Sequence, residues 1–513
     1  MHMSENISTA TLKNLSTGRS GFIEMHNLWT PRQKAKAAEI LAQIEDSGLE
    51  VIRMSFCDPH GLSRSKAVTA SSFASVLRNG IDCSPGPFIF DTGLDLVFNP
   101  FERGGGLNDD EMTGASSFVL VPDPETFRVL PWADKVGWII GDEYFKSGRP
   151  VPFSSRQLLK RMLAEVEARD LQYVVGLEVE WYLTRLVDLK NDLESVGGFG
   201  SPGAAPVVAP VNLGYQFNSE NLIDEVEGLI REIRSTLLSF GIPLRTTEHE
   251  SGPGQMEFTF DPMPALEAAD AMLLFRTTVK QLCARAGYHA TFMCAPALSG
   301  FDASGWHLHQ SLFDKGIGEN VFVAQQEGDF VSEFATHFAG GLVHHAAATA
   351  IFAAPTVNGY KRFSDRFSLS PDRATWSADN RGTYLRVLGG PGDPATHFEN
   401  RLGEPAANPY LYMASQLIAG LDGVDNKIDP GPLTDNPHEK DLPRLPSSLA
   451  QAADALDASE LFRRSAGDAF VDFYLGLKRN EWRRYIQYLE ENGIREDQNS
   501  VTEWEQREYF RSY

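Results

Sequence analysis

The clearest pattern in the chain is an alternation of apolar and polar positions from Leu171 to Leu183, which reads LQYVVGLEVEWYL. A period of two residues is typical of a β-strand with one face buried. The pattern places Leu177, Val179, Trp181 and Leu183 on one face. Glu178 and Glu180 therefore share the opposite face.

A β-hairpin is predicted from Ile242 to Asp261, where two short strand-like runs flank a Ser-Gly-Pro-Gly break. Glu250 lies at the end of the first run, and Glu257 lies in the second between two apolar residues. On this hairpin alone, a half-exposed strand with Glu257 facing water is as plausible as a functional carboxylate. The recurrence of acidic residues in other predicted strands favours function, because a buried carboxylate is costly without a partner.

Other segments follow the helical or strand period less strictly. Helices are predicted at 31–47, 155–169, 221–240 and 264–286, in the region 328–354, and from residue 447 onward. Short strands are predicted at 49–55, 88–91, 118–122, 136–140 and 305–313.

The predicted secondary structure changes at the proline-rich stretch 148–152, where short strands are followed by long helices. We place a domain boundary there, which divides the chain into a polar extension (1–30), a small strand-rich domain (31–149) and a larger domain (150–513). Residues 196–214, rich in Gly, Pro and Ala, predict a mobile surface loop. The fold class is α+β.

Charge and cysteine content restrict the function. The 513 residues include 46 Lys plus Arg and 69 Asp plus Glu, a net charge of −23, which opposes binding to nucleic acid or to an anionic membrane. The cysteines, Cys57, Cys83, Cys283 and Cys294, have no metal-site spacing and indicate reduced thiols.

The polar start lacks a signal peptide, and the apolar run 339–357 contains two histidines and a proline, which favours a buried helix. We expect a cytoplasmic protein that is not inserted in a membrane.

Acidic residues and histidines recur on separate predicted strands: Glu178, Glu180, Glu250, Glu257, His307, His309 and Glu399. Carboxylates that converge on one site cannot all ionise without cations, and oxygen-rich ligands favour Mg²⁺ or Mn²⁺. Four arginines lie in the same third of the chain, at positions 362, 381, 386 and 401. Metals together with guanidinium groups indicate phosphoryl transfer onto an acidic substrate. Taken singly, each arginine is more often a surface ion pair, and the E-x-E and H-x-H pairs are weak signals.

The order of the motifs is more specific than any one of them. From about residue 49 to the last helix, the chain resembles the glutamine synthetase family. The matching motifs are FDTG at 90, GLEVEW at 176, HESGPGQME at 249, SGWHLHQSL at 304, APTVNGYKR at 354, DNRGTYLRV at 379, FENR at 398 and PAANPYLYMASQLIAGLDG at 405.

The resemblance implies a fold and an assembly. We expect a small β-grasp-like N-terminal domain and a larger catalytic domain whose curved antiparallel sheet carries the metal ligands, flanked by helices. The family also implies a homododecamer of two stacked rings. Each active site is shared between neighbouring subunits, so that Asp91 acts on the site of a neighbour.

The resemblance also implies residue roles. Glu180, Glu250 and Glu257 would hold one divalent ion, and Glu178, His307 and Glu399 a second. His309, Ser311 and Arg386 match positions that contact ATP, Arg362 and Arg401 match those that bind glutamate, and Arg381 matches one that stabilises the transferring phosphoryl group. Asp91 matches the family's aspartate at the pocket that takes the proton of the amine, and Glu250 would lie close to it.

These roles imply an ATP-dependent ligase. The γ-carboxylate of L-glutamate would attack ATP to give γ-glutamyl phosphate, and an amine would displace the phosphate. The sequence departs from ammonia-using members at Leu94, Asp302, Ala303, Ser368 and Asp379. The form of residues 378–381 (ADNR) is similar to γ-glutamylamide synthetases.

We therefore predict an organic amine, alkyl or aryl, as the nucleophile. The alternatives are an ammonia-using glutamine synthetase and a catalytically silent structural relative, although the intact set of acidic residues argues against the latter. His438 stands where adenylyl regulation would require a tyrosine, so we expect no such control.

Overall fold

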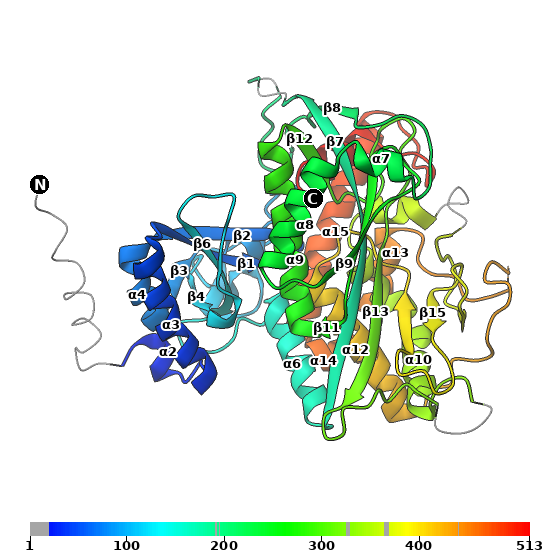
Figure 1. Cartoon of the computed structure of the whole chain (residues 1–513), viewed down its shortest axis with the longest axis horizontal. Helices are drawn as coiled ribbons and strands as arrows, with labels where there is room; N and C mark the ends of the chain where they lie inside the picture. The colour runs from blue at the N-terminus through cyan, green and yellow to red at the C-terminus, as the bar shows by residue number, and fades with distance from the viewer. Residues whose placement is uncertain (1–19, 190–191, 194, 325–328, 364–368, 440) are drawn as a thin grey trace, which may run out of the picture. The chain divides into compact units, whose positions relative to one another are not determined.

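The computed structural model describes residues 20–189, 192–193, 195–324, 329–363, 369–439 and 441–513 (Figure 1). Contacts divide the chain into two compact units. The first comprises the residues up to Asp58, Ser63–Phe88 and Phe98–Gln157. The second comprises Pro59–Leu62, Ile89–Val97 and Leu158–Tyr513. Pro59–Leu62 and Ile89–Val97, which fall within the predicted 31–149 domain, are thus grouped with the second unit. The domain limits proposed from the sequence stay a prediction.

The first unit is built on a six-stranded sheet in the order β2-β1-β6-β4-β3, with β5 beside β6. Strands β1 and β6 are parallel, and the other pairs are antiparallel. The strands are β1 (Val51–Cys57), β2 (Ser63–Thr69), β3 (Ile81–Cys83), β4 (Phe118–Pro122), β5 (Arg128–Val129) and β6 (Val136–Tyr144).

The helices of this part of the chain include the first one predicted. The α-helices are α2 (Phe22–Met25), α3 (Pro31–Ser47), α4 (Ala70–Asn79), α5 (Gly86–Ile89) and α6 (Ser155–Glu167), and the 3₁₀ turns are η1 (Arg103–Gly106), η2 (Asp110–Met112) and η3 (Pro124–Thr126). Helix α3 has the predicted limits, because Thr30 and Gln33 form a capping box at its start and Gly48 ends it in a left-handed conformation.

The strand predicted at 88–91 is wrong. Residues Gly86–Ile89 form the short helix α5, and Phe90 makes only an isolated bridge to Leu96. The Phe88 ring packs on Phe118 and Phe153, with ring centroids 5.4 and 6.4 Å apart. Burial of this ring, rather than strand pairing, fixes the segment, so tertiary packing overrides its β propensity.

The second unit contains a ten-stranded sheet in the order β14-β15-β16-β13-β7-β10-β9, with β8, β11 and β12 also paired to β7. All pairs are antiparallel except β14 with β15. The strands are β7 (Leu171–Asp188), β8 (Val207–Pro210), β9 (Leu244–His249), β10 (Gln255–Phe260), β11 (Met263–Pro264), β12 (Tyr288–Thr291), β13 (Trp306–Asp314), β14 (Trp376–Ala378), β15 (Leu385–Leu388) and β16 (His397–Asn400). The predicted hairpin is confirmed as β9 and β10.

The helices of the second unit agree with most of the predicted helical segments. They are α7 (Glu220–Asp224), α8 (Glu227–Ser239), α9 (Ala265–Arg285), α10 (Glu333–His344), α11 (Ala346–Ala353), α12 (Pro409–Asn426), α13 (Leu449–Asp457), α14 (Glu460–Ala466), α15 (Asp468–Glu491) and α16 (Glu503–Tyr509), with the 3₁₀ turn η4 (Asn358–Phe363). The predicted helix 221–240 is divided into α7 and α8.

One face of the large sheet packs against α8 and α9, which lie alongside it in Figure 1. Trp181 of β7 contacts the ring of Phe258 on β10, with centroids 5.6 Å apart, and Phe258 contacts Phe275 of α9 at 5.7 Å. This apolar face is the one that the period-two pattern predicts. Glu178 and Glu180 consequently lie on the face that α9 does not cover.

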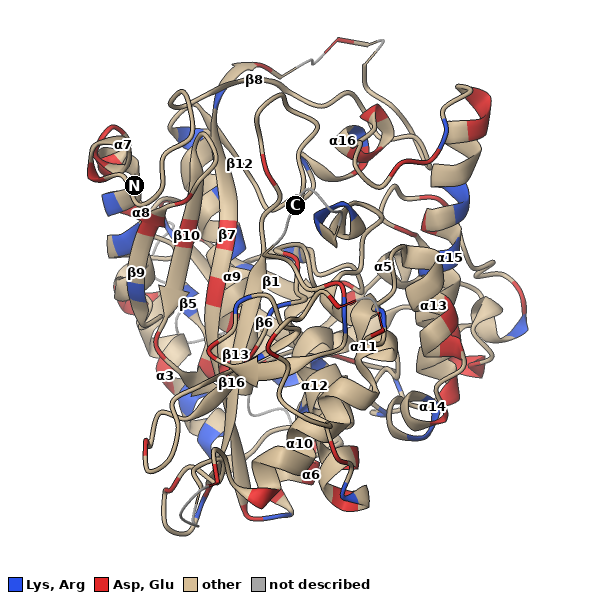
Figure 2. Cartoon of the chain, turned by 90° about the vertical axis from the view of Figure 1, so that its right-hand side faces the viewer, with Lys and Arg blue, Asp and Glu red and all other residues tan. Residues whose placement is uncertain are grey.

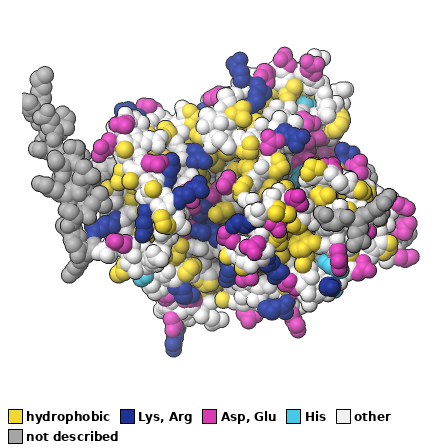
Figure 3. Space-filling view, turned by 60° about the horizontal axis from the view of Figure 1, so that its bottom comes forward, with side chains coloured by type: hydrophobic (Ala, Val, Ile, Leu, Met, Phe, Trp, Pro, Cys, Tyr) yellow, Lys and Arg dark blue, Asp and Glu magenta, His cyan; other side chains and the backbone are white. Residues whose placement is uncertain are grey.

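The surface has mixed charge. On the face seen in Figure 3, basic side chains lie among acidic ones. In the described residues, no helix combines the length and the apolar character needed to cross a membrane.

Candidate functional site

The register of the large sheet places the predicted site residues opposite one another. Glu257 of β10 faces Glu180 of β7, and His307 of β13 faces Glu178 of β7. Farther along, Glu399 of β16 lies between His309 of β13 and Arg386 of β15. Residues paired in this way have Cβ atoms about 5 Å apart, so their side chains interact directly. Figure 2 shows the acidic segments of β7 and β10 side by side.

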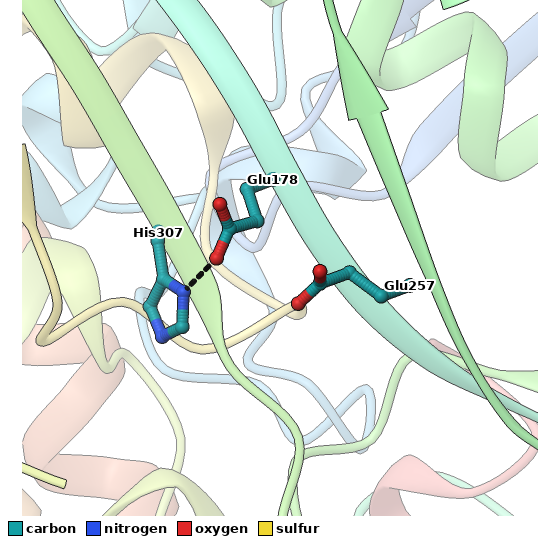
Figure 4. A group of neighbouring side chains, drawn as sticks. All are labelled: Glu178, Glu257 and His307. Carbon is teal, nitrogen blue, oxygen red and sulfur yellow. Dashed lines mark hydrogen bonds and ion pairs between the residues drawn. The ribbon is translucent and has the colours of Figure 1, made fainter. Parts of the chain in front are cut away.

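Two groups of these side chains are close enough to share a cation. Ligand atoms of Glu178, Glu257 and His307 all lie within 4.8 Å of one another, as do those of Glu178, His309 and Glu399. Nδ1 of His307 is 2.6 Å from Oε1 of Glu178, and the carboxylate of Glu257 points toward this pair (Figure 4). Glu178 belongs to both groups and therefore joins them.

A cavity of about 950 Å³ opens over these residues. It is lined by eleven of the predicted site residues: Glu178, Glu180, Glu250, Glu257, His307, His309, Ser311, Arg362, Arg381, Arg386 and Arg401. Glu399 is fully buried beneath the lining, and its carboxylate pairs with Arg386 and Arg401. The structure thus brings together every predicted site residue except Asp91. A cavity of this size, with several convergent polar groups, is typical of a small-molecule site.

Hydrogen bonds of His307 define its tautomer. A guanidinium NH₂ group of Arg362 lies 3.1 Å from Nε2 of His307, so Nε2 accepts and Nδ1 carries the hydrogen that it donates to Glu178. Burial and the nearby Arg401 together lower the pKa of His307 to about 4, although Glu178 and Glu399 oppose this shift. The imidazole is therefore neutral near pH 7, which is the form that binds metal ions.

The described side chains around the cavity supply too little positive charge to compensate its carboxylates. Burial, followed by repulsion from Glu178, Glu180 and Glu250, raises the pKa of Glu257 to about 10. Burial also raises the pKa of Glu180 to about 7, although Arg362 opposes this shift. Shifts of this size mean that Glu178, Glu180, Glu250 and Glu257 cannot all be ionised at pH 7 without further positive charge.

Glu178 and Glu399 stay ionised because cationic or donating groups compensate their burial. Burial opposes ionisation of Glu178, but hydrogen bonds from His307 and His309 bring its pKa below the ordinary value. For Glu399 the same burial penalty is outweighed by His307 and Arg401.

The donor set therefore fits divalent cations. Carboxylate oxygens with one or two neutral imidazole nitrogens are ligands suited to a hard divalent ion, and such an ion would supply the missing positive charge. Glu257 and Glu180, whose charged forms are the least favoured, would gain most from it.

Several residues that contact the site were not predicted from the sequence. Nε2 of His397 lies 2.9 Å from Nδ1 of His309, and the amide of Gln255 donates to Oε2 of Glu180 at 3.0 Å. Glu248 of β9 lines the cavity. Asp379, which the sequence identified only as a departure from ammonia-using members, accepts from Nε of Arg386 at 3.0 Å. Glu248 lies two residues before Glu250, so the strand period could have identified it. His397 and Gln255 likewise lie two residues before Glu399 and Glu257 on their strands, so the same period could have identified them.

Asp91 lies outside this cavity, in a buried network of its own. Its carboxylate accepts from Nε of Arg484 at 2.7 Å, from Asn480 at 2.8 Å, and from the backbone N–H groups of Gly93 and Asp95. Arg484 also donates to Glu508, whose carboxylate accepts from Thr92. In its own chain, Asp91 is therefore a structural anchor for the segment 89–97.

Only some of the positions at which the sequence departs from ammonia-using members line the cavity. Asp302 and Ala303 line the cavity. Leu94 is 43% exposed and adopts a left-handed backbone conformation (φ 61°) in the segment held by Asp91. Ser368 lies outside the described residues.

Comparison with known proteins finds relatives that cover almost the entire chain. Residues 152–509 match the sequence model of the glutamine synthetase catalytic domain. The chain is 46% identical over 494 residues to γ-glutamylanilide synthase of Acinetobacter sp., which covers 95% of this chain and 98% of the relative. It is 33% identical over 479 residues to glutamine synthetase of Pyrococcus furiosus, which covers 91% and 97%. A solved structure of GmaS without ligand superposes with a TM-score of 0.72 at 29% identity, covering 91% of this chain and 98% of GmaS.

Proposed function

Because the chain belongs to the glutamine synthetase family, we propose that it is an ATP-dependent ligase that joins the γ-carboxylate of L-glutamate to an organic amine. The products would be a γ-glutamylamide, ADP and phosphate. One observation carries the proposal: the acids, histidines and arginines expected for this chemistry line a single cavity of about 950 Å³.

The first chemical step transfers a phosphoryl group. An oxygen of the glutamate γ-carboxylate attacks the γ-phosphorus of ATP, the bond to the bridging oxygen breaks, and γ-glutamyl phosphate and ADP form. We assign Arg362 and Arg401 to the glutamate carboxylates, and His309, Ser311 and Arg386 to ATP. Arg381, which lines the same cavity, would stabilise the charge on the transferring group.

The second step forms the amide. The neutral amine nitrogen attacks the acyl carbon, phosphate leaves, and the proton of the nitrogen passes to a base. Glu250 suits this role because its carboxylate lies at the hairpin loop, accepts a hydrogen bond from the N–H of Ser251, and has a pKa raised by burial.

Divalent ions are part of the proposal, as Mg²⁺ or Mn²⁺ and at least two per site. Glu180, Glu250 and Glu257 would hold one, and Glu178, His307 and Glu399 the other, where they would neutralise the phosphate charge during transfer. His309 belongs to the same close group as Glu178 and Glu399, so its nitrogen is an alternative ligand.

An organic amine is favoured over ammonia by two observations. The relative at 46% identity is named for an anilide product, whereas the glutamine synthetase of Pyrococcus furiosus is at 33%. Leu94 and Asp379 also differ from the residues of ammonia-using members in ways that reduce the polarity or the positive charge of their surroundings.

We also propose a cytoplasmic homo-oligomer of two stacked rings, in which Asp91 and Leu94 contribute to the site of a neighbouring subunit. Neither residue is among the described residues that line the cavity of its own chain. Sedimentation of the purified protein tests this assembly.

A coupled assay of ADP release tests the activity, with L-glutamate, ATP, Mg²⁺ or Mn²⁺, and a panel of amines that includes ammonium, ethylamine and aniline. We expect turnover with an organic amine to exceed turnover with ammonium. Preference for ammonium would favour a glutamine synthetase, and the absence of ADP release with every amine would favour a silent relative.

A further inference from the structure

The cavity of about 950 Å³, which we refer to as the acidic cavity, is also lined by an exposed aromatic side chain. Phe217 is one of its lining residues, and 66% of its surface is accessible. Its neighbours in the lining include carboxylates, imidazoles and guanidinium groups. A large apolar surface left open inside such a cavity indicates contact with an apolar part of a ligand.

The register of the large sheet orders the acidic cavity from one end to the other. Ser311, which we assign to ATP, faces Val174 of β7, whereas Gln255, beside the hairpin loop, faces Tyr182 of the same strand. A strand rises about 3.3 Å per residue, so these two positions on β7 are about 26 Å apart. The N–H of Glu250 donates to the carbonyl of Gln255 at 2.8 Å. The proposed base therefore lies at the hairpin end of the cavity, far from Ser311.

Phe217 lies at the same end as this base. The N–H of Asn218, the next residue, donates to the carbonyl of His249 at 3.0 Å. His249 directly precedes Glu250 in the chain. One backbone hydrogen bond thus joins the segment that carries Phe217 to the strand end that carries Glu250.

The segment 212–218 is fixed at two further points. The side-chain amide of Asn212 lies 3.3 Å from Nε2 of the buried His249. The hydroxyl of Tyr215 donates to the carbonyl of Gly300. The backbone on either side of Phe217 is therefore held in place, and the ring is presented to the cavity from a positioned segment.

The chemistry of the three substrates decides which of them this ring can contact. A phenyl ring offers no ligand to a metal ion and no donor to a phosphate or carboxylate. L-Glutamate carries charged groups at both ends of a short chain, and the proposed ATP positions extend toward the opposite end of the cavity. The carbon atoms of an organic amine are the remaining apolar group, and its nitrogen must come to Glu250 at this end.

We propose that Phe217 is a specificity-determining residue, whose ring packs against the carbon substituent of the amine while the nitrogen lies at Glu250. This inference rests on the proposed ligase function and adds the residue that distinguishes one amine from another. Ammonium has no carbon substituent, so Phe217 adds nothing to its binding.

Removal of the ring is the first test. In Phe217→Ala we expect the ratio of kcat/KM for an organic amine to kcat/KM for ammonium to fall at least about 10-fold, while KM for ATP and for L-glutamate changes less than about twofold. Leu238→Ala is the matched control and should keep the ratio of the parent protein. Leu238 is an apolar residue, 51% exposed, on helix α8, which packs against the other face of the sheet.

A second variant should reverse the preference instead of weakening it. Phe217→Asp places a carboxylate where the ring lies, so an amine with a distal ammonium group gains a partner. We expect the ratio of kcat/KM for 1,4-diaminobutane to kcat/KM for pentylamine, which ends in a methyl group at a similar distance, to rise at least about 10-fold.

Unchanged amine ratios in both variants, with melting temperatures like that of the parent protein, would overturn the proposal. An equal loss of kcat/KM with every amine, accompanied by higher KM for ATP and L-glutamate, would also overturn it, because it would show a structural role for Phe217. ADP release by the unmodified enzyme with an organic amine would leave the ligase function intact in both cases. Absence of turnover with any organic amine would remove both the ligase proposal and this one.

Discussion

The second unit contains two groups of buried acids that are built in opposite ways. In the acidic cavity, Glu257 and Glu180 face each other across two strands and have pKa values raised to about 10 and about 7. In the Asp91 network, Arg484 lies between Asp91 and Glu508, and both of these carboxylates also accept hydrogen bonds from other groups.

This difference distinguishes a candidate functional site from a network that holds the fold together. Arg484 pairs with both Asp91 and Glu508, so each of these acids has a cationic partner within the folded chain. The acids of the cavity repel one another, and bound cations would compensate their charge. A buried acid without enough compensating charge, next to a cavity, therefore marks the site better than a buried acid alone.

Substitution in the uncompensated group should have the largest effect on activity. We expect Glu257→Gln to lower kcat/KM in the ADP-release assay by at least about 10³-fold, because it removes a proposed ligand of the divalent ion that would neutralise the phosphoryl charge in the transition state. Its melting temperature should not fall, since the variant removes a repelled carboxylate. Glu232→Gln, on the exposed surface of α8, is the control and should match the parent protein. Activity near that of the parent in Glu257→Gln would refute the assignment.

Substitution in the compensated group should instead affect stability. Arg484→Met leaves Asp91 and Glu508 buried without their cation, so we expect the free energy of unfolding to fall by about 3–5 kcal/mol. Urea titration followed by circular dichroism measures it. The adjacent Arg483, which is largely exposed and pairs with Asp95, is the control, and Arg483→Met should cost about 0–1 kcal/mol. Equal losses in the two variants would mean that the network is not what holds the segment 89–97.

Metal binding should distinguish the two groups directly. Addition of Mg²⁺ or Mn²⁺ to chelator-treated protein should stabilise the fold by about 2.7 kcal/mol when the ion is at 100 times its dissociation constant. The double variant Glu180→Gln/Glu257→Gln should lose this gain, and Arg483→Met should keep it. A shift in melting temperature that persists in the double variant would place the ions elsewhere.

Much of the fold and site could be predicted because local periodicity is strong where the ligands lie. The alternation along β7 specified that Glu178 and Glu180 share a face, and the Ser-Gly-Pro-Gly break specified the hairpin that carries Glu250 and Glu257. The pairing of Glu257 with Glu180 depends on the order of strands in the sheet, which periodicity does not contain. The family resemblance supplied that order.

The remaining errors and omissions have local causes. Residues 88–91 have strand-like composition but turn as a helix, because Phe88 packs into the first unit. Arg484 lies on the amphipathic helix α15, where an arginine is expected to face solvent, and only the fold brings it to Asp91.

The placement of the cavity lining affects how this enzyme could acquire new substrates. The proposed metal ligands other than Glu250 are held on paired strands, whereas other lining residues, including Asp302 and Ala303, lie on connecting segments, which tolerate replacement and insertion more readily. Mutations in those segments could exchange one nucleophile for another while the machinery that activates glutamate stays as it is. Inheritance of this arrangement would let related enzymes diversify by varying a few loop positions.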